Sequence, residues 1–203
     1  MHRRSAIFLD KDGTVLIDVP YNVDPDKMYP ARGAQAALQQ LAGLGWPLIV
    51  VSNQSGLALG RFTQPALTHM RARLAEIFDA CGARLHDFYY CPHHPQGSVQ
   101  TYARDCSCRK PEPGMLLRAA ADHDIDLQAS WMVGDILNDV EAGRRAGCRT
   151  ILIDNGNETE WQMSPPRRPE FVVADMEAAA HIIIACASES AAHQASSAEE
   201  AWR

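Results

Sequence analysis

The chain has 203 residues, of which 46% are hydrophobic and 22% are charged, and its formal net charge is −6. These values are ordinary for one globular domain with a sizeable core. The acidic balance argues against a general nucleic-acid surface or an anionic-membrane surface, and no apolar run approaches the length that spans a bilayer.

The N-terminus and the cysteines bear on the cellular compartment. Residues 1–5 are basic, but the apolar run that follows has only the length of a strand and ends in Asp10, unlike a secretory signal. We therefore expect a cytoplasmic protein without a membrane or nucleic-acid partner, and by default a monomer. In that compartment the six cysteines favour metal binding or burial over disulfides.

Taken in chain order, strand-like and helix-like segments alternate. Apolar runs predict buried strands at residues 6–9, 47–51, 87–90, 131–133, 150–153 and 171–173. Helical spacing and end signals predict helices at residues 31–44, 64–80, 113–123 and 139–146. This alternation predicts an α/β fold with a Rossmann-like, mostly parallel sheet and helices on both faces.

The same reading predicts a single domain over residues 1–187, because no second domain-sized segment is visible. Residues 18–30 are rich in proline and predict an irregular loop. Residues 188–203 are rich in alanine, serine and glutamate, and we expect them to form a disordered tail.

Asp10 and Asp12 stand at the end of the first predicted strand, directly before Gly13 and Thr14. Open α/β sheets bind their ligands at the carboxyl ends of strands. Two close carboxylates repel each other, so a cation would be a natural third member of this site. One carboxylate could then attack while the other shuttles a proton. The structural alternative is a turn with a solvated second aspartate.

Two further predicted strands end in polar groups. Residues 52–56 place a hydroxyl and several amides before a glycine, which could present donors to an anion or could form an ordinary polar loop. Asp135 ends another strand, and Asp139 follows it by about one helical turn. With Asp10 and Asp12 these carboxylates suit Mg²⁺, although Asp139 alone could serve the helix N-terminus.

Arg109 and Lys110 form a dense cationic pair before a predicted helix. Lys110 could neutralise a phosphoryl oxygen, and Arg109 could bind a second phosphate or a sugar oxygen through its planar fork. Without the acidic motifs, a solvated basic loop would be the better interpretation.

Residues 91–108 carry a set of metal-ligand side chains: Cys91, His93, Cys106 and Cys108. Three thiolates and one imidazole are the ligands of a closed, structural zinc site. A metal would fold this segment, which has little apolar content of its own. His94 could replace His93, and the alternative to a metal site is unrelated buried cysteines.

In combination these motifs resemble the haloacid-dehalogenase-like (HAD-like) phosphatases over about residues 5–155. The matching motifs are Asp10-x-Asp12-Gly13-Thr14, Ser52-Asn53-Gln54-Ser55-Gly56, Lys110-Pro111 and Gly134-Asp135-x-x-x-Asp139. Within that superfamily the zinc loop is similar to that of the D-glycero-D-manno-heptose-1,7-bisphosphate 7-phosphatases, whose close relatives are histidinol-phosphate phosphatases.

The resemblance implies a two-step mechanism. Asp10 would attack phosphorus and form an aspartyl-phosphate, and Asp12 would act as general acid and then as general base. Ser52 and Lys110 would hold the phosphoryl oxygens. Mg²⁺ would bind the carboxylates of Asp10 and Asp135 and the backbone carbonyl of Asp12, and Zn²⁺ would be structural.

The resemblance also implies the substrate and its contacts. The expected reaction is hydrolysis of the C7 phosphate of a heptose 1,7-bisphosphate, with histidinol phosphate or another small sugar phosphate as the alternative. The spacings leave no room for a large cap domain, so the zinc loop and residues 18–30 would shape the pocket. The expected substrate contacts are Asp18, Tyr21, Asn53, Gln54, Ser55 and Arg109.

Two departures from the family pattern bear on substrate choice. Ile136 follows Asp135 where close relatives often carry lysine, and Pro20 stands where glycine is usual. Two other functions stay open at this point. A zinc-dependent nucleic-acid module is disfavoured by the acidic net charge, and a phosphotransferase would pass the phosphoryl group to an acceptor other than water.

Overall fold

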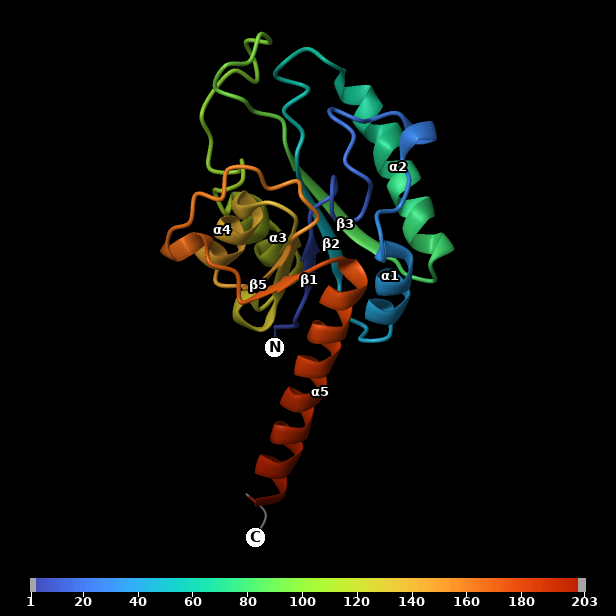
Figure 1. Cartoon of the computed structure of the whole chain (residues 1–203), viewed down its shortest axis with the longest axis vertical. Helices are drawn as coiled ribbons and strands as arrows, with labels where there is room; N and C mark the ends of the chain where they lie inside the picture. The colour runs from blue at the N-terminus through green and yellow to red at the C-terminus, as the bar shows by residue number, and fades with distance from the viewer. Residues whose placement is uncertain (1–2, 201–203) are drawn as a thin grey trace.

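The computed structural model describes residues 3–200 (Figure 1). Its six strands form one parallel sheet in the order β3-β2-β1-β4-β5-β6. The strands are β1 (Ile7–Leu9), β2 (Leu48–Asn53), β3 (Leu85–Cys91), β4 (Trp131–Gly134), β5 (Arg149–Ile153) and β6 (Phe171–Val173). The helices are α1 (Ala34–Ala42), α2 (Gln64–Ala80), α3 (Gly114–His123), α4 (Leu137–Ala146) and α5 (Met176–Glu200). The predicted α/β class with a parallel sheet is confirmed.

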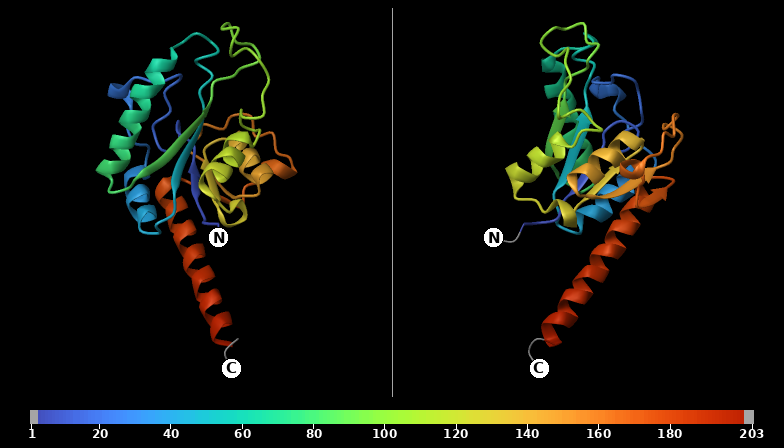
Figure 2. Two further views of the ribbon diagram at one scale, coloured as in Figure 1. Left: turned by 180° about the vertical axis from the view of Figure 1, so that it is seen from behind. Right: turned by 90° about the vertical axis from the view of Figure 1, so that its left-hand side faces the viewer.

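The apolar side chains of the strands pack into two hydrophobic cores, one on each face of the sheet. Ile7 and Leu9 of β1 belong to the core cluster that includes residues of α1, α2 and α5, whereas Phe8 belongs to the cluster with α3 residues. Successive side chains of a strand point to opposite faces, so a strand covered on both sides is apolar throughout. Figures 1 and 2 show α1 and α2 on one face of the sheet and α3 and α4 on the other.

The register of the central strands brings their carboxyl ends to one edge of the sheet. Leu9 of β1 pairs with Val50 of β2 on one side and with Val133 of β4 on the other. The residues that follow these positions therefore meet at that edge. The loop between β3 and α3, yellow-green in Figure 1, rises at the same end of the molecule.

Helix α5 differs from the sequence prediction. The sequence predicted no helix in this region and a disordered tail from Ser188, whereas one helix runs from Met176 to Glu200 and projects from the domain (Figures 1 and 2). Its first turns bury Met176 and Ile183. Alanine has the highest helix propensity, so a helix begun by packing continues readily along an alanine-rich segment. Residues 201–203 of the predicted tail lie outside the described residues.

None of the helices within residues 3–200 has both the length and the apolar character needed to cross a membrane.

Candidate active site

A glycine turn joins the β1 and β4 ends of the site. Gly13 has φ +83°, and a Cβ atom there would lie 1.9 Å from Asp135 Oδ2 and 2.5 Å from Asn157 Nδ2. Only glycine accepts both this backbone conformation and this close approach. The Thr14 hydroxyl donates a hydrogen bond to Asp135 Oδ1 over 3.4 Å. The loop after β1 is thus fixed directly against the first residue after β4.

Lys110 lies at the centre of the site and is almost completely buried. Its ammonium contacts Asp10 Oδ1, lies 2.6 Å from Asp139 Oδ1 and donates to the Val51 carbonyl at 2.9 Å. Burial by itself lowers the pKa of Lys110, but the carboxylates of Asp10 and Asp139 outweigh that effect and raise the pKa. Lys110 is therefore a fixed cation beside Asp10.

The backbone of Lys110 is held by the loop after β2. The Asn53 side-chain amide donates to the Lys110 carbonyl and accepts from the Lys110 N–H, each over 3.0 Å. Gln54 Nε2 donates to Ser52 Oγ at 2.8 Å. The predicted anion-binding loop at residues 52–56 therefore fixes the position of the predicted phosphate-binding lysine.

Three carboxylates crowd around this lysine. Oxygens of Asp10, Asp135 and Asp139 lie within 4.8 Å of one another, and all three residues are buried. Burial, followed by repulsion from Asp10 and Asp139, raises the pKa of Asp135 to about 8. The excess of negative charge and the all-oxygen donor set fit a divalent cation such as Mg²⁺.

Asp139 has two contacts that match both sequence interpretations. Its Oδ2 accepts from the Ile136 N–H at 3.3 Å, as expected of a carboxylate in the first turn of α4, and its Oδ1 faces Lys110. Its buried carboxylate therefore adds negative charge beside Lys110 and also accepts a hydrogen bond at the start of α4.

Asp12 turns its carboxylate toward a residue that the sequence analysis did not single out. Lys11 has no solvent exposure, and its ammonium lies 2.6 Å from Asp12 Oδ1 and 3.1 Å from the Asn22 carbonyl. Burial raises the pKa of Asp12 to about 6, against the opposing charge of Lys11 and with a further contribution from Asp10. A proton can therefore reside on Asp12 near neutral pH, as a general acid requires.

These residues surround a pocket of about 320 Å³ at the carboxyl edge of the sheet. Asn157, which the sequence analysis also missed, lines it and donates to Asp135 Oδ2 at 2.7 Å. Arg109 is the predicted site residue that does not line the pocket: its guanidinium instead faces the His93 carbonyl, 3.5 Å away. The lining includes the predicted residues Asp10, Asp12, Asp18, Tyr21, Ser52, Asn53, Gln54, Ser55, Lys110 and Asp135.

The predicted zinc ligands come together on the loop between β3 and α3. The Sγ atom of Cys91 lies 3.5 Å from that of Cys106 and 3.2 Å from that of Cys108, and His93 Nδ1 lies 3.4 Å from Cys108 Sγ. Thiolates bound to a tetrahedral zinc at 2.3 Å would stand about 3.8 Å apart. The four donors therefore fit a structural zinc ion.

The two neighbouring histidines differ in their contacts. His93 belongs to the cluster of possible metal ligands, whereas His94 Nδ1 accepts a hydrogen bond from the Gln96 N–H at 3.2 Å.

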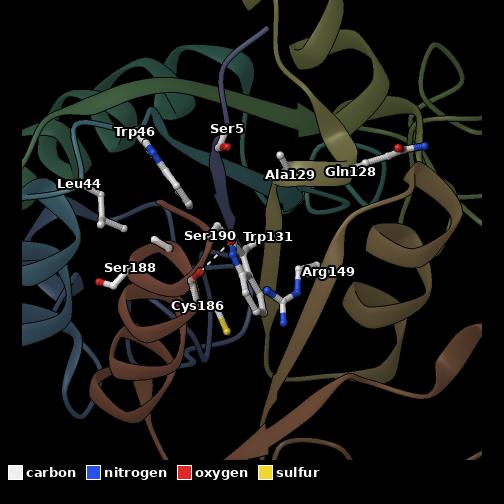
Figure 3. Close-up of a pocket in the computed structure, with 11 residues that line it drawn as sticks. Ser5, Leu44, Trp46, Gln128, Ala129, Trp131, Arg149, Cys186, Ser188 and Ser190 are labelled. Atoms are coloured by element: carbon white, nitrogen blue, oxygen red, sulfur yellow. Dashed lines mark hydrogen bonds between the residues drawn. The ribbon is translucent and has the colours of Figure 1, made fainter. Parts of the chain in front are cut away.

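A larger cavity, of about 630 Å³, lies beside the start of β4 and β5 (Figure 3). It is lined by Trp46, Trp131 and Cys186 among others, and the Arg149 guanidinium lies 4.0 Å from the centroid of the Trp131 ring. Within the described part of the chain no carboxylate lines this cavity. It therefore lacks the carboxylates that the smaller pocket offers as acid, base and nucleophile.

Comparison with known proteins places this arrangement in a family. A family model for HAD-hydrolase-like proteins matches residues 107–179. The D-glycero-beta-D-manno-heptose-1,7-bisphosphate 7-phosphatase of Pasteurella multocida is 42% identical over 154 residues, which cover 75% of this chain and 83% of that protein. The protein of the same name from Escherichia coli K12 is 42% identical over 168 residues, or 78% of this chain and 88% of that protein.

A solved structure agrees with these sequence relatives. The D,D-heptose 1,7-bisphosphate phosphatase from B. bronchiseptica, crystallised with magnesium and phosphate, superposes with a TM-score of 0.76 at 32% identity. The match covers 89% of this chain and 98% of that chain. The chain belongs to the heptose-1,7-bisphosphate 7-phosphatase family of HAD-like hydrolases.

Proposed function

We propose that this chain is a Mg²⁺-dependent phosphatase that hydrolyses the C7 phosphate of a D-glycero-D-manno-heptose 1,7-bisphosphate. The observation that carries the proposal is the pairing of Asp10 with the buried cation of Lys110, beside Asp135, in a pocket open to a small ligand. The names of the relatives supply the substrate.

In the first step, the Asp10 carboxylate attacks phosphorus and the bond between phosphorus and the sugar oxygen breaks. Asp12 donates its proton to the departing sugar oxygen, a role that its raised pKa of about 6 supports. Lys110 and the Ser52 hydroxyl hold the non-bridging phosphoryl oxygens as charge develops on them.

In the second step, water attacks the phosphorus of the aspartyl-phosphate. Asp12, now ionised, takes the proton of that water, and the bond between phosphorus and the Asp10 carboxylate breaks. Inorganic phosphate leaves, and Asp10 returns to its carboxylate form.

The two metal sites have different roles in this proposal. Mg²⁺ would be held by the carboxylates of Asp10 and Asp135 and by the Asp12 carbonyl, and when bound it would offset the repulsion between Asp10 and the anionic substrate. Zn²⁺ would be held by the cluster of residues 91–108, where all four positions are taken by protein donors, so its contribution is structural.

The remaining expectations belong to the same proposal. Asp18, Tyr21, Asn53, Gln54 and Ser55 contact the sugar from the pocket lining, and Arg109 reaches it from the base of the zinc loop. The enzyme acts as a monomer in the cytoplasm. All six cysteines are free, which is consistent with a reducing compartment.

Phosphate release from heptose 1,7-bisphosphate (both anomers) and from histidinol phosphate tests the proposal. We expect turnover of a heptose bisphosphate that stops with chelator, returns with Mg²⁺ and is absent in Asp10→Asn. A strong preference for histidinol phosphate would replace the substrate but keep the reaction. A phosphorylated acceptor instead of free phosphate would make the chain a phosphotransferase.

A further inference from the structure

Asp135, one of the three buried carboxylates of the candidate site, has a hydrogen-bond donor at each of its oxygens. The Thr14 hydroxyl donates to Oδ1 over 3.4 Å, and Asn157 Nδ2 donates to Oδ2 at 2.7 Å. An ionised carboxylate only accepts hydrogen bonds, so the nitrogen of the Asn157 amide, and not its oxygen, faces Asp135. Asn157 therefore supports this carboxylate and does not add an oxygen ligand beside it.

Asn155 connects Asn157 to the glycine turn after β1. Its Oδ1 accepts a hydrogen bond from the Asn157 N–H at 3.1 Å, and its Nδ2 donates to the Gly13 carbonyl at 2.7 Å. Both asparagines belong to the loop between β5 and β6, which is orange in Figure 1. Because Thr14 directly follows Gly13, the two donors that hold Asp135 are connected to each other through Asn155.

Glu158, the next residue of this loop, is bound to the start of α4. Its Oε2 accepts from the Leu137 N–H at 2.7 Å, and its Oε1 accepts from the Glu160 N–H at 2.9 Å. The first N–H groups of a helix have no partner within the helix, so a side-chain acceptor at this end is stabilising. Because α4 begins two residues after Asp135, this contact fixes the loop against the same strand end.

The far end of the loop is also fixed to α4. Arg167 Nη2 donates to Asn138 Oδ1 at 2.6 Å, and Arg167 Nε lies 3.3 Å from Glu141 Oε2. The side chains of Arg167 and Glu141 are only 16% and 11% exposed, so water screens this ion pair less than a surface pair. The loop that carries Asn157 is therefore attached to α4 at two separate points.

We propose that Asn157 is a positioning residue for the cation site: its amide holds the Asp135 carboxylate in the orientation that binds Mg²⁺ and so raises the affinity of the substrate-free protein for the ion. The inference rests on the proposed function, which it deepens, because that function supplies the identity of the ion. A ligand that is already oriented loses less side-chain freedom when it binds. Hydrogen bonds to metal ligands typically contribute a factor of about 10–100 in metal affinity.

The test measures Mg²⁺ binding without substrate, by isothermal titration calorimetry, in the wild type and in Asn157→Ala and Asn157→Gln. We expect the Mg²⁺ dissociation constant to rise about tenfold in Asn157→Ala. Asn157→Gln keeps an amide donor on a longer side chain and should recover part of this loss. In the phosphate-release assay, the Mg²⁺ concentration that gives half the maximal rate should rise by the same factor. The kcat at saturating Mg²⁺ and the KM for substrate should change little.

Gln162→Ala is the matched control. Gln162 is an exposed amide of the same loop that contacts Arg167 through its backbone carbonyl, so the variant should bind Mg²⁺ like the wild type. An unchanged Mg²⁺ dissociation constant in Asn157→Ala, with or without a loss of stability in urea unfolding, would overturn the inference. A raised KM at unchanged Mg²⁺ affinity would also overturn it, because Asn157 would then be a substrate contact. If Mg²⁺ binding depended on Asn157 but the wild type released no phosphate from any sugar phosphate, the proposed function would fail and the inference would stand.

Discussion

The Lys11 ammonium lies 2.6 Å from Asp12 Oδ1 and has no exposure to solvent. The same ammonium donates to the Asn22 carbonyl, which belongs to the proline-rich loop that carries Asp18 and Tyr21. A single buried cation thus connects the proposed general acid to the loop expected to bind the substrate. Loss of this cation would therefore affect both the Asp12 carboxylate and the position of that loop.

Replacement of Lys11 by methionine should therefore slow the reaction and destabilise the fold. The variant leaves Asp12 and the Asn22 carbonyl without their buried partner, at an expected cost of about 1–3 kcal/mol in the free energy of unfolding. We expect kcat to fall at least tenfold and Lys11→Arg to retain more activity than Lys11→Met. Urea unfolding and steady-state kinetics measure the two effects.

Lys27→Met is the control for loss of a lysine. Lys27 pairs with Asp24 at 3.2 Å on the surface, where 67% of the lysine side chain is exposed, so its removal should change stability by less than about 1 kcal/mol. If Lys11→Met kept wild-type kcat and stability, the contacts of Lys11 would contribute neither to catalysis nor to the free energy of unfolding.

The sequence predicted most of the residues that line the candidate site, because most of them follow strand ends. Asp10 and Asp135 each follow a short apolar run, and in a parallel sheet the ends of such runs meet. Lys11 was not predicted, because the inward direction of its side chain depends on the carbonyl of Asn22, which the loop supplies only in the folded chain.

Other differences from the sequence prediction have similar causes. Asn157 contacts Asp135 from a loop after β5 whose polar composition indicated nothing beyond a loop. The strands were predicted because buried apolar runs are distinct, whereas α5 has an apolar cluster at residues 182–184 without a clear helical period. Arg109 was assigned to the substrate from its planar fork and from the family resemblance, and its contact with the His93 carbonyl is a tertiary feature.

Mg²⁺ should stabilise the protein more at alkaline than at acidic pH. Burial and the neighbouring carboxylates raise the pKa of Asp135 from 3.8 to about 8 in the metal-free protein. The folded chain then holds a proton that the unfolded chain releases, so this group's contribution to stability falls as pH rises from about 4 to about 8. Mg²⁺ requires the ionised carboxylate and therefore competes with that proton.

Thermal unfolding with and without Mg²⁺ checks this dependence. The increase of Tm on addition of Mg²⁺ should be larger at about pH 8 than at about pH 6. In Asp135→Asn the increase should shrink at both pH values, because a ligand is lost. An increase of equal size across this range in the wild type would contradict the competition between proton and metal.

Substitution of Gly13 by alanine should abolish activity. The methyl group would enter a left-handed backbone position and lie 1.9 Å from Asp135 Oδ2, which displaces a proposed metal ligand. Gly82→Ala is a matched control, since Gly82 has φ +67° and nothing within 4 Å of the added Cβ atom. It should cost only about 1–2 kcal/mol of backbone strain and leave kcat unchanged. Comparable activity in the two variants would show that displacement of Asp135 by a methyl group at residue 13 does not affect the reaction.

Loss of zinc should unfold the segment of residues 91–108 before the rest of the domain. Cys106→Ser removes one of four donors that lie within 4.8 Å of one another, so bound zinc, measured by atomic emission, should fall from about one ion per chain to near zero. Amide hydrogen exchange should then increase in this segment. Cys81→Ser, outside the cluster, should retain the metal. Unchanged exchange in a zinc-free Cys106→Ser protein would show that the loop folds without the ion.

The two parts of α5 should contribute unequally to stability. Met176, Ala179, Ala180 and Ile183 are buried to 1% exposure or less, and Ile183→Ala should lower the free energy of unfolding by about 2–4 kcal/mol. Ser188 and Glu189, in contrast, are exposed. A chain that ends at Ala187 should therefore retain its activity and lose less than about 1 kcal/mol. Because isolated helical turns are marginal in water, a larger loss on truncation would mean that the projecting part of α5 is stabilised by a contact that a single copy of the chain does not provide.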